Sequence, residues 1–141
     1  MPDHIPHRKL TLDGALRAVQ AGIAKAAAMN VPQCITVVDD AGCQIAFVRM
    51  DGARFLSLES SLHKAMTAAS SRRPTGPREA DVEVKIAITT GGRNIALLGG
   101  IPILVKGVCI GAVGVGSGTG AQDREVALAA VSAIRGAQRR F

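Results

Sequence analysis

Hydrophobic residues recur at helical spacing once a short polar stretch has ended. Residues 1–9 are polar and contain two prolines, which predicts an N-terminal arm. After Thr11 the apolar positions are three or four residues apart and therefore share one helix face. They are Leu12, Leu16, Val19, Ile23 and Ala26. Asn30 and Pro32 stop the pattern, so we predict a helix between Thr11 and Asn30 that buries this stripe.

The segment after this helix predicts a β-hairpin. Two β-branched runs flank residues 39–42, which read Asp-Asp-Ala-Gly and favour a turn. If the turn is centred on residues 40 and 41, Cys34 lies opposite Phe47. Cys43 then lies too far from Cys34 for a disulfide bond.

A second helix is predicted from about Phe55 to Ser71. Its apolar positions fall on one side and are Phe55, Leu58, Leu62, Ala65 and Ala69. Its polar positions fall on the other side and are Ser60, His63, Lys64, Thr67 and Ser71. Pro74 and Pro77 end the helix. The pattern predicts that the apolar side packs inward.

The rest of the chain predicts a short helix, a second hairpin and a last helix. The short helix covers about residues 78–87, and two strands within residues 95–116 flank a turn at Lys106 and Gly107. Thr119 and Gln122 fit a capping box, which predicts a helix from there to about residue 138. Its inward positions are Val126, Ala130 and Ile134. Hairpins with tight turns favour the α+β class, an antiparallel β-sheet flanked by helices. We expect residues 10–141 to form one domain.

The composition limits which residues can form the core, which cellular compartment we expect and which partners the chain could bind. The 141-residue chain is 48% hydrophobic but only 2% aromatic, so its core must be aliphatic and rich in alanine. The three cysteines match no zinc pattern, and we expect buried, reduced thiols in a cytoplasmic protein. No apolar run is long enough for a membrane span. The net charge of +6 lacks the interleaved aromatics of nucleic-acid binders, so we expect a basic surface that attracts acidic ligands, and no nucleic-acid partner.

Three motifs, in order, resemble the GlcG/HbpS family of haem-degrading-domain proteins. Residues 37–53, VVDDAGCQIAFVRMDGA, resemble its VVD-x-x-G and R-M-D-G-A elements. Residues 63–69, HKAMTAA, resemble its K-A-x-T-A helix, and residues 99–127 resemble its glycine-rich stretch that ends in Q-D-x-x-x-A. The likeness covers about residues 10–138 and extends to the C-terminal domain of PduO-type proteins.

The resemblance implies a layered α/β sandwich of the profilin or PAS type that assembles into dimers or larger rings. Some similar proteins are implied to bind or degrade haem, and others to take part in the catabolism of small organic acids. We therefore expect a homo-oligomer with a small-molecule ligand, either haem or a small carboxylic acid. Haem is the one cofactor that we consider, and we expect no metal site besides it.

Residues 59–67 carry the strongest candidates for chemistry. Glu59 and His63 are four residues apart and share a helix face. The carboxylate could hold the imidazole in one tautomer and prepare it as a general base or a ligand. Lys64 and Thr67, which fall on the family's K-A-x-T-A motif, could hold a ligand carboxylate. The alternative is a solvated helix face with an ordinary charge pair.

A glycine-rich segment at residues 111–123 leads from a strand into a capped helix start. Backbone N–H groups at Gly116, Ser117 and Gly118 could therefore meet an anion. The alternative is a plain strand-to-helix turn that packs against a neighbouring subunit. A nucleotide site is disfavoured, because too few residues follow for another strand with an acidic residue.

Two arginines add further candidates for ligand binding. Arg49, at the end of the first hairpin, could grip a ligand carboxylate, or could pair with Asp39 or Asp51 and lock the hairpin. Arg93 lies in the loop at residues 89–94, which either closes on an acid or is a plain loop.

Three functions remain open on these grounds. The first is an oligomeric small-ligand-binding protein that holds haem or a related tetrapyrrole, with His63 or Thr67 near the iron. The second is a cofactor-independent lyase or isomerase for a small organic acid in a catabolic pathway, with His63 as the acid or base. The third is an accessory protein without turnover. We rank the first ahead of the others, while the scarcity of aromatic residues favours the small organic acid of the second function over haem.

Overall fold

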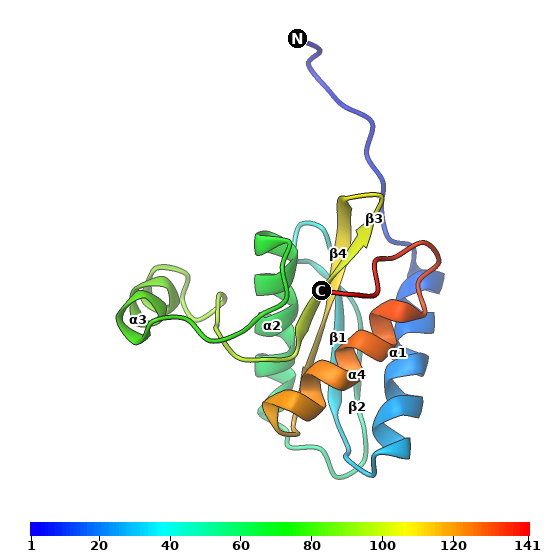
Figure 1. Cartoon of the computed structure of the whole chain (residues 1–141), viewed down its shortest axis with the longest axis vertical. Coiled ribbons are helices and arrows are strands. Elements are labelled where there is room, and N and C mark those ends of the chain that lie inside the picture. Colours follow the sequence, from blue (N-terminus) through cyan, green and yellow to red (C-terminus); the bar gives the residue numbers. More distant parts are fainter.

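The computed structural model covers residues 1–141 and consists of one sheet with helices on both faces. In chain order the elements are α1 (Leu12–Ala28), β1 (Cys34–Asp39), β2 (Gln44–Arg49), α2 (Ser57–Ser71), α3 (Ala80–Thr89), β3 (Gly100–Val105), β4 (Val108–Gly116) and α4 (Gly120–Ser132). The strands pair antiparallel in the order β2-β1-β4-β3. Helices α1 and α4 cover one face of the sheet, and α2 covers the other (Figure 1). The predicted α+β class is confirmed.

The face under α1 and α4 holds a dry aliphatic core, as the composition predicts. Its fully buried side chains include Ile35, Val37, Ile101, Ile103, Val113 and Val115 from the strands. The inward positions predicted for the last helix are confirmed, because Val126, Ala130 and Ile134 are all buried there. The capping box of Thr119 and Gln122 starts α4 as predicted, but the helix ends at Ser132, short of residue 138.

The predicted stripe of α1 is partly wrong. The helix itself forms as predicted, with the Thr11 hydroxyl accepting the Gly14 N–H. Leu12 and Leu16, however, are 57% and 44% exposed. The side toward the sheet carries small residues, and a methyl group on Gly22 would lie 2.8 Å from Cδ1 of Ile35. Helix and sheet are therefore too close for leucines between them.

The two predicted hairpins form, the first with a different register. Cys34 pairs with Arg49 instead of Phe47. The turn is longer than predicted, with the Asp39 carboxylate accepting the N–H groups of Ala41 and Cys43, and a bulge between Val37 and Val38 shifts the pairing by one residue more. In the second hairpin Lys106 and Gly107 adopt φ values of 50° and 77°, as a tight two-residue turn requires.

No disulfide bond forms, and the expectation of buried thiols holds for two of the three cysteines. Cys34 and Cys109 are buried, whereas Cys43 is exposed just after the first turn. Burial raises the pKa of the Cys34 and Cys109 thiols above the ordinary value of 9.0, although Arg49 acts in the opposite direction on Cys34. The buried pair is therefore chemically quiet compared with Cys43.

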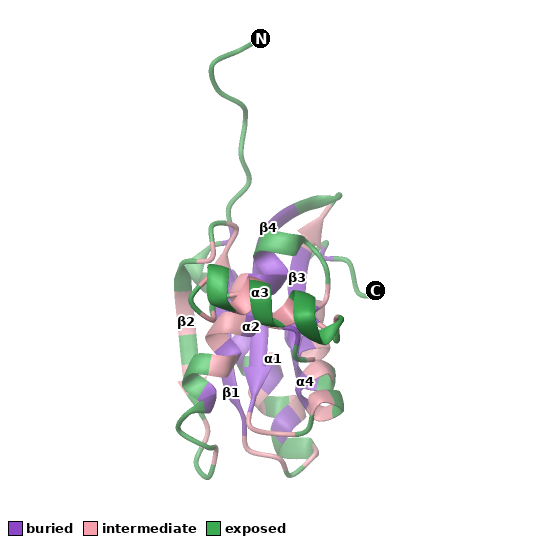
Figure 2. Ribbon diagram, turned by 90° about the vertical axis from the view of Figure 1, so that its left-hand side faces the viewer, coloured by how far each residue is buried: buried purple, intermediate pink, exposed green.

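Residues 72–99, hereafter the projecting segment, are bonded to the sheet near both ends, at Thr75 and Gly99. Their middle part stands away from the sheet beside α2 (Figures 1 and 2). The predicted short helix lies here as α3, and none of its residues is buried. Val84 and Ile88 are 57% and 75% exposed. Residues 1–9 also extend away from the sheet and are exposed throughout. No helix is long and apolar enough to cross a bilayer.

Candidate functional site

Helix α2 packs on the sheet through small and polar residues and not through its leucines. Its buried residues are Ser57, Ser61, Lys64, Ala65, Thr67, Ala68 and Ala69. The predicted orientation is partly wrong, because Phe55 and Leu58 are 64% and 45% exposed, whereas Ala65 and Ala69 are buried as predicted. A methyl group on Gly114 would fall on the backbone of Ser61 and Ala65. Because the strands present glycine to α2, the helix lies too close to them for large side chains.

Lys64 forms a buried ion pair that joins three elements. Its Nζ donates to the Val115 carbonyl oxygen and to Oδ2 of Asp123, both at 2.8 Å. The two side chains are 5% and 4% exposed. Oδ1 of Asp123 accepts the N–H of Gly118 at 2.9 Å. The pair therefore fixes α2 to β4 and shapes the glycine-rich loop before α4.

The hydroxyl of Thr67 holds the projecting segment against α2. It donates to the His63 carbonyl oxygen at 2.7 Å and accepts the N–H of Ile95 at 2.9 Å. The Arg93 carbonyl oxygen lies 3.3 Å away. Thr67 is buried and its hydroxyl is already hydrogen-bonded. Its main contribution is therefore to position the projecting segment, and not to bind a ligand directly.

His63 and Glu59 lie on the outer side of α2, away from the sheet. The imidazole is half-buried and Glu59 is exposed. The two form no ion pair, since the ion pairs of the chain join other residues. The predicted charge pair that would orient the imidazole is therefore not formed.

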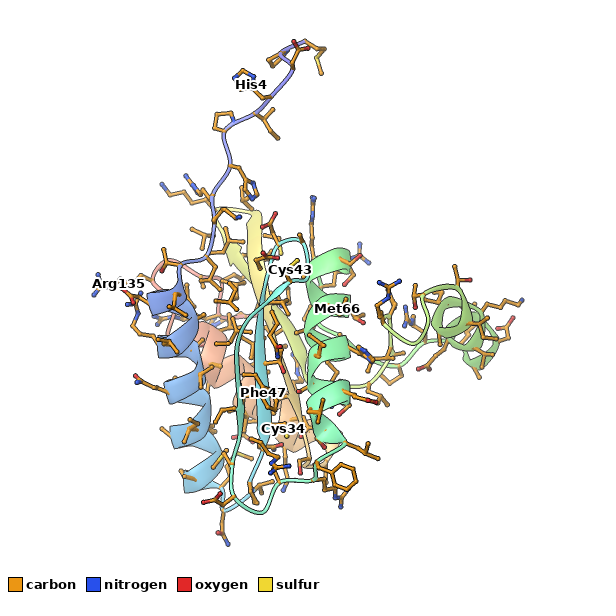
Figure 3. All side chains as sticks on the ribbon, turned by 180° about the vertical axis from the view of Figure 1, so that it is seen from behind. His4, Cys34, Cys43, Phe47, Met66 and Arg135 are labelled. Carbon is orange, nitrogen blue, oxygen red and sulfur yellow. The ribbon has the colours of Figure 1, made fainter.

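Cavity 1 lies between α2, the first turn and the end of the projecting segment, and its volume is about 330 Å³. Met66 and Thr67 line it from α2, and Arg93 and Asn94 line it from residues 90–94. Met66 projects toward the turn that carries Cys43 (Figure 3). Nε of Arg93 donates to the Thr90 carbonyl oxygen at 2.9 Å, and Oδ1 of Asn94 is buried without a hydrogen bond.

Cavity 2 lies between the first half of α2, residues 96–98 and the loop before α4, and its volume is about 410 Å³. Ser60 and Lys64 line it from α2, and Arg54 lines it from the preceding loop. Ser117 and Gly118 line it on the side of α4. The Ser117 hydroxyl accepts the N–H of Arg54 at 2.8 Å, which holds the two loops together.

Five of the predicted site residues line a cavity: Lys64, Ser117 and Gly118 line cavity 2, and Thr67 and Arg93 line cavity 1. The other four, His63, Glu59, Arg49 and Gly116, line neither of them. Arg49 is exposed on the edge strand and forms no ion pair, so the predicted lock with Asp39 or Asp51 is absent. Gly116 is covered by α2, since a methyl group there would lie 2.7 Å from Oγ of Ser60.

Sequence reasoning missed several lining residues, among them Arg54, Ser60 and Met66. Met66 stands within the motif HKAMTAA but has the spacing of an ordinary apolar residue. The helical pattern assigns Ser60 to the polar side of the helix and indicates no role for it. Arg54 lies in a loop, and only the course of the chain brings it to α2, so no local pattern could have indicated it. Asn94 belongs to the candidate loop at residues 89–94, and it lines cavity 1 beside Arg93.

Comparison with known sequences places these features in a family. Residues 10–132 match the family model of the haem degrading protein HbpS-like group. The chain is 38% identical over 123 residues to a 15.0 kDa protein from the dhaT-dhaS intergenic region of Citrobacter freundii, covering 84% of this chain and 87% of that protein. It is 40% identical over 98 residues to GlcG of Escherichia coli, covering 69% and 73%. It is 27% identical over 134 residues to the longer corrinoid adenosyltransferase PduO of Citrobacter freundii, covering 92% and 40%.

Comparison with solved structures agrees with this family assignment. The crystal structure of Klebsiella pneumoniae ORFY superposes with a TM-score of 0.87 at 32% identity, over 95% of this chain and 96% of that one. The PduOC–haem complex has the same fold, with a TM-score of 0.83 at 24% identity over 95% and 100%. The chain belongs to the family of the haem degrading protein HbpS-like group, with GlcG and PduO among its relatives.

Proposed function

We propose that this protein is an oligomeric small-ligand-binding protein that holds haem or a related tetrapyrrole over the outer side of α2. The observation that carries the proposal is the position of His63. It is half-buried, and residues within one helical turn of it line cavity 2 on one side and cavity 1 on the other. A ligand larger than either cavity would span both and meet the imidazole between them.

The donor groups on this side fit haem. Imidazole and thioether groups are haem-iron ligands, and His63 and Met66 are three residues apart on α2. Arg54 in cavity 2 and Arg93 in cavity 1 would pair with propionate groups. Bound haem would supply an iron that accepts further ligands and exchanges electrons. Leu97, which is 54% exposed, would contribute apolar contact and help exclude water.

A second copy of the chain would cover the same side. Phe55, Leu56 and Leu58 around α2 are exposed by 45% or more, and so are Val84 and Ile88 of α3. Large exposed apolar side chains that gather on one side of a protein favour burial against a partner. Assembly through α2 and α3 would bury it and shield a ligand beside His63 from solvent.

An absorbance titration of purified protein with haem tests the proposal. The parent protein should give a saturable, sharply shifted haem band, and H63A should lose it because the imidazole is the proposed iron ligand. H4A is the matched control, because His4 is exposed on the N-terminal arm and should not matter. A weak change that is equal in all three proteins would contradict the proposal and would indicate nonspecific adsorption to a basic surface.

The alternative function is a cofactor-independent lyase or isomerase for a small organic acid. Cavity 2 favours it, because Gly120 opens α4 there and the first amides of a helix have no intrahelical acceptor and attract anions. Beneath this loop the buried amide of Gln33 has no hydrogen-bond partner and lies close to Gly118. In this reading His63 moves the proton while the loop holds the carboxylate.

Turnover of a panel of small carboxylic acids tests this alternative. H63A should abolish any turnover found, because no other imidazole lies on α2. E59Q should keep most of it, because Glu59 forms no ion pair with His63. Turnover that is unchanged in H63A would contradict the alternative.

A further inference from the structure

Arg78 in the projecting segment carries an unsatisfied guanidinium edge. Its Nε and Nη2 are both buried, and no acceptor in the chain bonds to either of them. The residue as a whole is half-buried, but these two donors have lost water and gained no acceptor in exchange, which is costly. An acceptor from outside the chain would complete their hydrogen bonds.

The group lines a third cavity that offers donors and no opposing charge. Cavity 3 lies between the end of α2 and residues 73–78, with a volume of about 330 Å³. Arg73 and Arg78 both line it, and no acidic residue does. Thr75 also lines it and is only 5% exposed. Its hydroxyl accepts the N–H of Gly100 at 2.8 Å, while its own proton has no acceptor in the chain.

We propose that cavity 3 binds a small oxyanion, the carboxylate or phosphate group of a small molecule. Nε and Nη2 lie on one edge of the guanidinium plane, and such an edge binds two oxygens of one anion in parallel. The Thr75 hydroxyl adds a third donor, and Arg73 adds positive charge at the cavity. Pro74 and Pro77 restrict the backbone of this loop, so the donors are held in place before the anion arrives.

This oxyanion site is separate from the proposed haem site. Cavity 3 shares only Thr67 with cavity 1 and only Pro77 with cavity 2. Neither His63 nor Met66 lines it. Failure of haem binding would therefore leave the oxyanion proposal intact, and the reverse also holds.

Isothermal titration calorimetry on the full chain tests the proposal, with inorganic phosphate and succinate as probes and ionic strength held constant with sodium chloride. The parent should bind at least one probe saturably, and the probe that binds identifies the anion class. R78Q should bind it about tenfold or more weakly, because it loses a charged two-point contact. R135Q is the matched control, since exposed Arg135 lies on the opposite side of the molecule (Figure 3), and T75S should keep binding.

Thermal unfolding gives a second readout that separates an anion site from a structural arginine. Without multivalent anions, R78Q should unfold at the same temperature as the parent or higher, because it removes an unpaired buried charge. Phosphate or succinate should then raise the unfolding temperature of the parent and not that of R78Q. Absence of binding in the parent, or equal binding in R78Q, would overturn the proposal.

Discussion

The two faces of the sheet are built differently. Under α1 and α4, isoleucine and valine from three strands form a continuous aliphatic core. Under α2, the strands present Gly100, Gly114 and Gly116. The side of the helix that packs against them consists mainly of serine and alanine, with one buried lysine. A smaller apolar cluster of Val38, Ala112 and three alanines of α2 lies there, and a buried hydrogen bond of 2.8 Å joins Thr36 to Ser61. The first face is held by burial of a large apolar area, and the second by a smaller apolar cluster together with close approach and specific polar bonds.

This difference explains why the candidate sites lie on one side. Polar bonds at Lys64 and Thr67 fix the loops around α2, and the cavities form where those loops meet the helix. The opposite face offers no such loops, because α1 and α4 cover it. Both faces therefore contribute to stability, by different means, while the candidate ligand sites lie on the α2 side alone, and substitutions should distinguish the two contributions.

The largest effect is expected from breaking the buried ion pair. K64M leaves the Asp123 carboxylate buried without its cation, which should cost about 3–5 kcal/mol in the free energy of unfolding. Urea denaturation measures this. The control is E125Q, which breaks the Lys25–Glu125 pair, whose side chains are 37% and 55% exposed, and should cost less than about 1 kcal/mol. Equal effects of the two variants would contradict the assignment.

The next effect concerns added volume. G114A places a methyl group on the backbone of α2 and should destabilise by about 1–3 kcal/mol. On the other face, I103V removes a methyl group from the aliphatic core and should cost about 0.5–1.5 kcal/mol. The same denaturation experiment compares them. If G114A unfolded like the parent, the close approach of α2 would be refuted.

A smaller and local effect is expected at the projecting segment. T67V removes the acceptor of the Ile95 N–H, which should cost about 1 kcal/mol. Hydrogen exchange should become faster at Ile95 and unchanged in α1. S70A, an exposed neighbour on α2, is the control. Unchanged exchange at Ile95 in T67V would show that other contacts hold the segment.

The smallest effect is a loss of stability at alkaline pH. Burial raises the pKa of Cys34 and Cys109 above 9.0, so the unfolded chain loses these thiol protons at lower pH than the folded one. Stability is therefore full below the unfolded pKa and falls as pH rises through the folded pKa, by less than about 1.4 kcal/mol per pH unit and thiol. C109A should flatten the fall and exposed C43A should not. Identical pH profiles of the two variants would refute this origin.

Local signals allowed much of the fold to be predicted. The turn at Lys106 and Gly107, the capping box at Thr119 and the breaks at proline all act within a few residues, and all appear where expected. The predicted register of the first hairpin is wrong, because Asp39 stabilises a longer turn and a bulge between Val37 and Val38 shifts the pairing further.

The site was harder to predict, because it depends on how closely α2 approaches the sheet. The leucines of α2 suggested an inward side, but glycines more than 30 residues away in β3 and β4 admit only small residues there. The close approach of α2 to these glycines places Lys64 and Thr67 on the side that faces the sheet and His63 on the outer side. The family resemblance marked Lys64 and Thr67, yet their bonds to Asp123 and Ile95 could only be seen in the folded chain.

Hydrogen–deuterium exchange with and without haem tests the central claim most directly, because it reports both faces in one experiment. We predict that haem slows exchange in residues 57–71 and 90–98 and leaves α1 and α4 unchanged, and that H63A removes this protection. Protection over α1 and α4, or protection that persists in H63A, would contradict the assignment of the ligand to the outer side of α2.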